Sequence, residues 1–499
     1  MLFNSLEFLI FLPLVFAVYW ILNRWTGARA GLRLQNLLIL AASYLFYGWW
    51  DWRFLTLIAF STLVDFAVGL QIAKANQPLA TSPPDARSSV ARRWLILSIL
   101  VNLGLLGYFK YAGFFLESWV EAWSALGVSM HTSSLKIILP VGISFYTFQT
   151  LSYSIDIYRR KLEPTRDFIA FAAFVSFFPQ LVAGPIERAS ALLPQIVRRR
   201  EFSYDLAVSG MRLILWGFFK KVVVADTCAV YVNQIFSNPD AFTAPTLILG
   251  AMYFAIQVYG DFSGYSDIAI GTARLFGIRL TMNFKSPFFA RDIAEFWRRW
   301  HISLTTWFRD YLYYPLGGSR GGKAQAIRNT FVIFVVSGFW HGANWTFLLW
   351  GLIHAVLFLP LLITGRNRRN TGDIEGLPSF REILGIGWTF MAFAISMVVF
   401  RSETVGDAGA FLWRWFDSPA TWTSIYPRFR NPALLSSLFL MFAVDWAQRS
   451  GREMAFNWRR IRFIPDFAVS ALRWAAMLST LIWVGTKFYS DAAFIYFQF

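Results

Sequence analysis

Cysteine, histidine and charged residues are all scarce in this chain of 499 residues. It has one cysteine, Cys228, and four histidines, and only 15% of its residues are charged, whereas a soluble domain has about 25%. One cysteine excludes an internal disulfide and a metal cluster built on cysteines, and we expect Cys228 to be a buried, inert thiol. The low charge content excludes an ordinary soluble protein.

Long apolar runs fill most of the chain, which is 56% hydrophobic and 19% aromatic. A helix needs about 17–25 apolar residues to cross a bilayer. Runs of this kind lie at about 7–23, 34–50, 54–73, 94–116, 135–157, 168–186, 206–235, 245–276, 327–344, 345–364, 383–400, 432–448 and 468–487. They predict an all-α polytopic membrane protein with about 11–13 transmembrane or re-entrant helices.

No stretch between these runs is long enough for a separate soluble domain. We therefore expect one membrane-embedded domain over residues 1–499. Its sections would be N-terminal helices in 1–125, a core in 135–364 and C-terminal helices in 383–499.

The net charge of +17 comes from short basic loops between the apolar runs. This pattern marks the cytoplasmic side of a membrane protein, so we expect no nucleic-acid partner. Basic residues gather in 24–33, 74–93 and 159–166, which we expect in the cytoplasm. The loop near 117–134 has two glutamates and His131, and we expect it outside, with His131 in water.

The N-terminal apolar run lacks the charge pattern of a signal peptide. Its first basic residue, Arg24, comes after the run, whereas a signal peptide has its charge before the apolar stretch. We expect a retained first helix with the N-terminus outside.

The run at 168–186 does not fit a simple crossing. A crossing would place Arg188 and the basic residues 198–200 outside, and Pro179 and the pair at 184–185 interrupt the run. We therefore expect a re-entrant segment that returns to the cytoplasmic side. Such broken helices occur only where protein or a water-filled cavity covers them.

Polar residues interrupt the apolar segment at 257–267. Asp261 and Asp267 are six residues apart, about 240° around a helix, so they do not share a face. Together with Ser263 and Tyr265 they are candidates for lining a substrate channel. The alternative is a tight helix contact, since glycines four residues apart are typical of packed membrane helices.

Residues 295–318 are rich in tryptophan, tyrosine and arginine and too polar to cross lipid. An interfacial helix with aromatic anchors is one interpretation of this stretch. His301 fits that interpretation less well because histidine is so scarce. The candidate site residues here are Trp297, Arg298, His301, Arg309 and Asp310. The glycine-rich turn at 317–322 lacks a Walker lysine and a preceding strand, so it does not support nucleotide triphosphate hydrolysis.

His341 lies between Trp340 and Gly342 in an apolar run that extends to about residue 363. An ionisable side chain at membrane depth indicates function, and histidine moves protons near neutral pH. Asn344 follows in the same stretch. His354 is about 220° away on a continuous helix, and we expect it to be a packing residue. No short-range pair of ligands suggests a metal, so we expect none.

These motifs resemble the membrane-bound O-acyltransferase superfamily, and within it the bacterial alginate O-acetylase branch. The matching segments, in chain order, are Pro140–Tyr146, Phe178–Pro185, Asp261–Asp267, Glu295–His301, Arg309–Gly318, Trp340–Asn344, Phe400–Ser402 and Phe494–Phe499. The resemblance covers nearly the whole chain. It is more specific for the superfamily than for the substrate.

The resemblance implies a ring of helices around a thinned centre, where a cytoplasmic funnel for the acyl donor meets an outer pocket for the acceptor. It implies that His341 is the catalytic base and that His301 is the second histidine of the branch. The co-substrate would be acetyl-CoA or another acyl thioester, with no bound cofactor and no metal. Basic groups such as Arg298, Arg299 and Arg309 would hold the donor's phosphates, although the same charges suit anionic lipid.

The resemblance also implies a bacterial inner-membrane enzyme that acts with separate periplasmic acetyltransferase proteins on a polysaccharide such as alginate. Peptidoglycan, another exopolysaccharide, and D-alanyl transfer to teichoic acid are alternatives. A proton-coupled transporter is the alternative from a different class, but the expected internal repeat is not found. An export scaffold or pore would leave the Trp340–Asn344 stretch unexplained.

Overall fold

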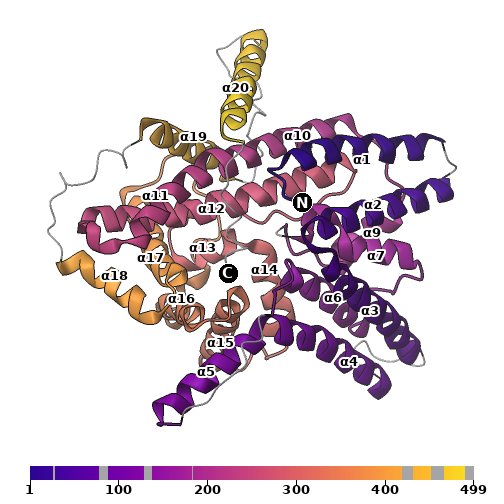
Figure 1. The fold of residues 1–499 in the computed structure, drawn as a ribbon, viewed down its shortest axis with the longest axis horizontal. Helices are drawn as coiled ribbons and strands as arrows, with labels where there is room; N and C mark the ends of the chain where they lie inside the picture. The colour runs from indigo at the N-terminus through magenta and orange to yellow at the C-terminus, as the bar shows by residue number, and fades with distance from the viewer. Residues whose placement is uncertain are drawn as a thin grey trace. The chain divides into compact units, whose positions relative to one another are not determined.

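A computed structural model gives the fold of the chain (Figure 1). The structure describes residues 1–499 except 26–27, 78–87, 129–136, 183, 418–430, 451–465 and 489–499. His131 and the terminal motif Phe494–Phe499 lie outside the described residues. The chain divides into two compact units, one of residues 1–210 and 269–281 and the other of 211–268 and 282–499.

The first unit is built from the N-terminal helices. Its elements are α1 (Leu6–Trp25), α2 (Ala28–Asp51), η1 (Trp52–Phe54), α3 (Leu55–Asn76), α4 (Ser89–Leu106), η3 (Gly107–Tyr111), α5 (Ala112–Ala125), α6 (Ile143–Tyr158), α7 (Phe168–Ser176), α8 (Phe178–Leu181) and α9 (Ala189–Val197). The start of α10 (Tyr204–Phe218) also belongs to it.

The second unit contains both candidate histidines. After α10 come η4 (Phe219–Ala225), α11 (Asp226–Ser237), η5 (Pro239–Ala241), α12 (Ala244–Leu275), η6 (Pro287–Phe289), α13 (Ile293–Arg299), α14 (Ile302–Phe308), η7 (Arg309–Tyr313), α15 (Lys323–His341), α16 (Trp345–Ile363), η8 (Arg366–Arg368), α17 (Phe380–Arg401), α18 (Val405–Asp417), α19 (Pro432–Gln448) and α20 (Asp466–Lys487). The last turns of α12 belong to the first unit.

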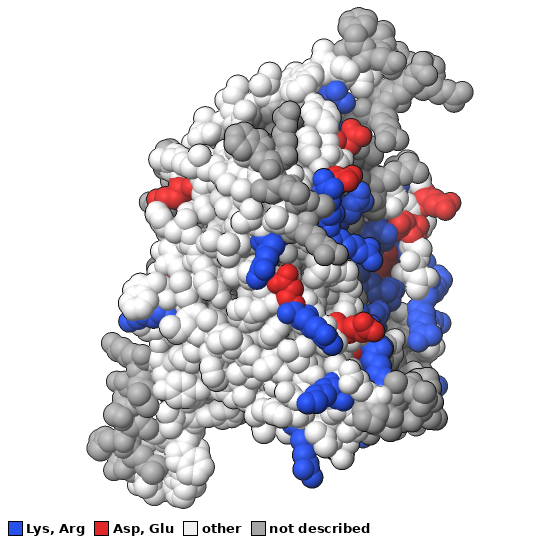
Figure 2. Space-filling model, turned by 90° about the vertical axis from the view of Figure 1, so that its right-hand side faces the viewer, with Lys and Arg blue, Asp and Glu red and all other residues white. Residues whose placement is uncertain are grey.

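The predicted all-α membrane fold is confirmed. The described residues form helices without a strand, and six stretches are long and apolar enough to cross a bilayer. These are Leu6–Asn23, Ala30–Asn76, Ser89–Ala125, Trp345–Ile363, Phe380–Arg401 and Val469–Lys487. On the face shown in Figure 2, wide areas carry no charge, and Asp and Glu side chains lie among the Lys and Arg side chains.

The run at 168–186 is broken, as predicted, but its first break comes two residues before Pro179. Helix α7 ends at Ser176, and Phe177 leaves the helical conformation with φ −49° and ψ 104°. Pro179 then lies inside the first turn of α8, where a missing N–H is tolerated. With nine and four residues, neither helix can span a bilayer at about 1.5 Å per residue. Their return to the cytoplasmic side stays a prediction.

A buried carboxylate joins three helices of the first unit. Asp65 on α3 is fully buried and accepts hydrogen bonds from Ser98 and Asn102 on α4 and from Ser154 on α6, at 2.5, 2.8 and 3.1 Å. Each of these donors would be costly to bury alone. The network therefore holds α3, α4 and α6 in one register.

Helices α15 and α16 form a tight hairpin in the second unit, and α15 ends at His341. A Cβ atom added to Gly338 on α15 would clash with the backbone carbonyl oxygen of Phe347, and one added to Gly351 on α16 would clash with that of Phe334. The two backbones can therefore approach so closely only with glycine at both positions. This contact fixes where the end of α15 lies.

We predict that Gly338→Ala lowers the stability of the protein, because backbone atoms cannot yield to the added methyl group. Overpacking of this kind costs about 1–3 kcal/mol. The matched control is Gly104→Ala on α4, where an added Cβ meets nothing within 4 Å. It should be neutral or slightly stabilising, since alanine favours a helix by about 0.5–1 kcal/mol. Thermal unfolding of the solubilised chain, followed by tryptophan fluorescence, measures both; equal melting temperatures for the two variants would contradict the close packing.

Candidate active site

His301 lies at a sharp turn between two short helices. It is the residue before α14 and has left-handed backbone angles, φ 43° and ψ 53°, which are uncommon for a residue other than glycine. The neighbouring segment holds the turn in place: Ile302 N–H donates to the Asn283 carbonyl and Lys285 N–H to the Arg299 carbonyl, both at 2.9 Å. A strained backbone fixed in this way is typical of functional positions.

The side chain of His301 is buried and held at one ring nitrogen. Its Nδ1 lies 3.1 Å from Oδ1 of Asn283, and its ring packs edge-on against Phe262 with centroids 4.7 Å apart. Its Nε2 is buried without a hydrogen-bond partner among the described residues. Burial lowers the pKa of His301 well below its ordinary value, and the charge of nearby His341 lowers that pKa further.

His341 is the last residue of α15 and lies among aromatic rings. Its ring centroid is 5.0 Å from Trp340, 5.2 Å from Trp350 and 5.6 Å from Phe400. The ring of Trp340 is also 6.0 Å from that of His301. The structure thus brings the two predicted catalytic histidines to the same tryptophan, although they are 40 residues apart in the chain. Their catalytic roles stay predictions.

A third histidine lies close to the same cluster. His354 on α16 is fully buried, and its ring is 4.7 Å from Trp350 and 4.9 Å from Trp297. Its Nε2 lies 3.0 Å from the hydroxyl of Ser396 on α17. These contacts describe a packing residue, as the sequence suggested. Its neighbour Trp350 also contacts His341. The angle between His341 and His354, worked out for one continuous helix, did not predict that the two histidines share this neighbour.

Asp261 and Asp267 are paired with two consecutive lysines from another helix. Lys220 lies 2.7 Å from Asp267, and Lys221 lies 2.7 Å from both Asp261 and Asp226. The lysines belong to the π-helical segment η4. Sequence reasoning did not select them as site residues. The sequence did contain a signal for them, namely two adjacent lysines in an apolar run. Charged side chains in such a run need partners of opposite charge.

The close contact between α12 and the helix that contains the two lysines also explains why α12 has glycines here. A Cβ on Gly264 would come within 2.7 Å of the Gly217 carbonyl oxygen, and one on Gly217 within 2.6 Å of the Gly264 carbonyl oxygen. The predicted close helix packing is therefore present, with ion pairs on either side of it. Ser263 and Tyr265, the other channel candidates on α12, are 1% and 4% exposed.

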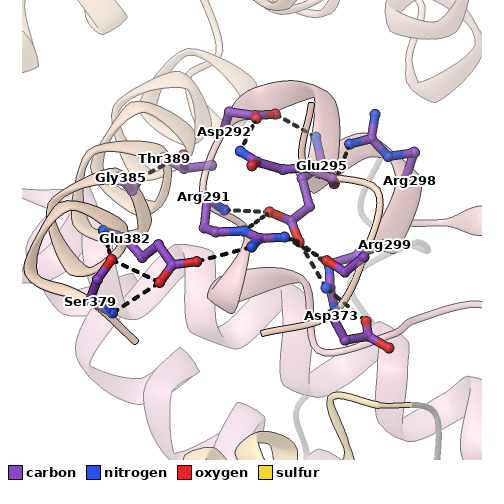
Figure 3. Close-up of polar contacts among 12 residues, drawn as sticks. Arg291, Asp292, Glu295, Arg298, Arg299, Asp373, Ser379, Glu382, Gly385 and Thr389 are labelled. Atoms are coloured by element: carbon purple, nitrogen blue, oxygen red, sulfur yellow. Dashed lines mark hydrogen bonds and ion pairs between the residues drawn. The ribbon is translucent and has the colours of Figure 1, made fainter. Parts of the chain in front are cut away.

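Figure 3 shows the contacts of the arginines in α13 and of Arg291 just before it. Glu295, 2% exposed, accepts from Nε of Arg291 at 2.9 Å and from Nη2 of Arg299 at 2.8 Å. Arg291 also reaches Glu382, and Arg299 reaches Asp373, at 3.0 and 3.1 Å. The network joins α13 to the loop before α17 and to the start of α17.

The remaining basic candidates also have protein partners. Arg298 donates to the carbonyl oxygens of Asn367 and Asn370, at 2.8 and 2.7 Å. Arg309 pairs with the adjacent Asp310 at 2.7 Å. These contacts give the arginines a structural role, while their binding of donor phosphates stays a prediction.

Asn344 and Trp297 have clear structural tasks. Asn344 caps α16, since its Oδ1 accepts from Thr346 N–H at 3.1 Å, and its Nδ2 donates to the Glu403 carbonyl at 2.9 Å. Trp297 packs from α13 against Phe334 at 5.4 Å between centroids, and so joins α13 to α15.

Among the described residues, no three His, Cys, Asp or Glu side chains are grouped as a metal ion would need.

Comparison with known proteins identifies the family. The family model of the membrane-bound O-acyltransferases matches residues 39–400. The probable alginate O-acetylase AlgI of Pseudomonas syringae pv. tomato is 40% identical over 410 residues, which cover 82% of this chain and 74% of that protein. The AlgI protein of Pseudomonas aeruginosa is 40% identical over 419 residues, covering 84% and 74%.

Relatives named for other activities are less similar to this chain. The peptidoglycan O-acetyltransferase of Helicobacter pylori is 36% identical over 383 residues, covering 71% of this chain and 69% of that protein. The teichoic acid D-alanyltransferase of Streptococcus thermophilus is 30% identical over 285 residues, covering 52% and 68%. Since the family match spans most of the chain and contains both histidines of the Trp340 cluster, the chain belongs to the membrane-bound O-acyltransferase family.

Proposed function

We propose that this enzyme transfers an acetyl group from acetyl-CoA, or a related acyl group from another thioester, to a hydroxyl of a cell-surface polysaccharide. The observation that supports this most is the meeting of His301 and His341 at Trp340, buried in the second unit. Acyl transfer to a hydroxyl needs a base for the hydroxyl proton and a donor for the oxyanion. Two histidines in one buried site can take the hydroxyl proton and orient the reacting groups.

In this proposal His341 is the base. The hydroxyl oxygen attacks the thioester carbonyl carbon while His341 takes the hydroxyl proton. The tetrahedral oxyanion then collapses, the carbon–sulfur bond breaks, and His341 returns the proton to the leaving thiolate. His301 orients the reacting groups or stabilises the oxyanion. No covalent acyl-enzyme is needed, so the donor and the acceptor meet directly.

The acceptor is proposed from the relatives. The two relatives at 40% identity are named alginate O-acetylases, which favours alginate or a similar exopolysaccharide, reached directly or through periplasmic acetyltransferase proteins. Peptidoglycan and D-alanyl transfer to teichoic acid rank lower because the corresponding relatives are less similar.

We further propose that the chain lies in the bacterial inner membrane with its N-terminus in the periplasm. The basic loops support this orientation, because basic residues are retained in the cytoplasm. The acyl donor would then enter from the cytoplasm, and the acceptor from the periplasm.

We predict that His341→Ala abolishes the acetyl ester on the acceptor polymer, since no base then takes the hydroxyl proton. Loss of a general base costs about 10²–10⁴-fold in rate. The ester content of the host's surface polysaccharides is measured at matched membrane levels. The control is Val336→Ala on the same helix, where the side chain is 40% exposed; it should keep the ester content of the unmodified chain.

Two outcomes would count against this assignment. Full ester content with His341→Ala would remove His341 as the base. Unchanged ester on every polymer when the whole chain is deleted would remove the acyltransferase proposal for this host and favour the transporter alternative.

The orientation is tested by introducing single cysteines at exposed sites. Cys228 is fully buried, so it leaves a low background for a membrane-impermeant maleimide. We predict that Thr404→Cys, before α18, is labelled in cells with a permeable outer membrane. Arg366→Cys, after α16, should be labelled only once the inner membrane is opened. The reverse pattern would contradict the proposed orientation.

A further inference from the structure

The orientation of the Asn283 amide is fixed by its neighbours. Its Oδ1 lies 3.3 Å from the backbone N of Ser303, and a backbone N–H can only donate. Its Nδ2 in turn donates to the hydroxyl of Ser266 on α12 at 3.2 Å. The amide is fully buried, so an inverted amide would leave the Ser303 N–H facing another donor with no acceptor to replace it, which is unfavourable in a buried site.

This orientation determines which nitrogen of His301 has the proton. Oδ1 of Asn283 is only an acceptor, and Nδ1 of His301 faces it at 3.1 Å. Nδ1 must therefore donate, and in the neutral ring Nε2 then has the lone pair. That nitrogen is the one without a partner among the described residues, on a side chain that is 1% exposed.

We propose that Asn283 is a positioning residue that holds His301 in its Nδ1–H tautomer, so that Nε2 is presented to the reaction site as a hydrogen-bond acceptor. The second partner of a ring nitrogen commonly sets the tautomer in this way. The inference goes beyond the proposed function and rests on it only for the kinetic test below.

This tautomer decides between the two roles proposed for His301, which were to orient the reacting groups or to stabilise the oxyanion. A neutral ring with its proton on Nδ1 cannot donate from Nε2, so it does not stabilise the oxyanion. His301 instead accepts a hydrogen bond and orients a donor in the site. Burial and the nearby His341 keep the ring neutral, because both lower the pKa of His301.

His354 provides an internal comparison with the opposite tautomer. The hydroxyl of Ser396 donates to the Phe393 carbonyl at 2.7 Å, and its single proton is thereby used. The Ser396 oxygen must then accept from Nε2 of His354, 3.0 Å away. The same chain should contain one buried histidine of each tautomer.

The first test measures the tautomers directly. The full chain, labelled with ¹⁵N only at histidine, is studied in lipid bilayers by solid-state NMR, and the spectra of His301→Gln and His354→Gln assign the signals. We expect a protonated Nδ1 and an unprotonated Nε2 for His301, and the reverse for His354. A protonated Nε2 on neutral His301 would overturn the proposal, whatever the enzyme's activity.

The second test separates positioning from simple packing. Asn283→Leu keeps the size but removes the acceptor, and we expect acetyl transfer from acetyl-CoA in membrane vesicles to fall about 10–100-fold at every pH, as for other lost orienting partners. Asn283→Asp keeps an acceptor for Nδ1–H, and we expect it to recover activity at high pH. Asn329→Leu is the fold control, because Asn329 is equally buried and bonds to the backbone carbonyls of Leu316 and Gly318 and to the Arg328 side chain, with no hydrogen bond to a histidine among the described residues.

The expected pH shift has a definite sign. A carboxylate at position 283 favours the charged form of His301 and raises its pKa, so the ring loses its acceptor lone pair at a higher pH. The acid limb of the Asn283→Asp profile should therefore move upward. The titratable group that acts on His301 in the unmodified chain is His341; Phe262, Phe284 and Trp340, which pack on the ring, are uncharged.

The results distinguish this proposal from the proposed function. Equal losses for Asn283→Leu and Asn283→Asp at every pH, in folded protein, would overturn the positioning role. Asn283→Leu with unchanged activity would do the same. If the unmodified chain transfers no acetyl group from acetyl-CoA, the proposed function with this donor fails, while the NMR result still decides the tautomer.

Discussion

The need to satisfy every polar group inside an apolar environment governs this structure. Lipid offers no hydrogen-bond partner, so a polar side chain at membrane depth requires one within the protein. Asp65 meets this need with serine and asparagine donors from α4 and α6. Lys221 meets it with Asp226 and Asp261. In both cases the polar contact also fixes how helices pack.

The candidate site departs from this rule at one nitrogen of His301. Asn283, itself bonded to Ser266, holds one side of the ring, while Nε2 has no partner among the described residues. A group that is positioned firmly on one side and left open on the other is what a catalytic site requires.

The sequence predicted the helices well and their partners poorly. Apolar length was enough to find α16 and α17, because spanning a bilayer dictates length and composition. Interruptions of the segment at 168–186 were expected at Pro179 and at the pair 184–185. The first occurs at Phe177 instead, since proline fits the first turn of α8, while 184–185 is non-helical as expected. The pairing of Asp261 with Lys221 joins residues 40 positions apart, which periodicity along one helix cannot show. Asn283, likewise, has no motif of its own, and only the folded turn reveals its contact with His301.

The central claim is that the thioester reacts beside Trp340, between His301 and His341. The most direct measurement is an electron cryo-microscopy structure of the full chain with a non-reactive acetyl-CoA analogue. We predict that the acetyl group lies at the Trp340 cluster, with a histidine nitrogen within about 2.6–3.2 Å of the position of the attacking hydroxyl or one water away. An analogue bound with its acetyl group elsewhere, for example against Lys220 and Lys221, would contradict it.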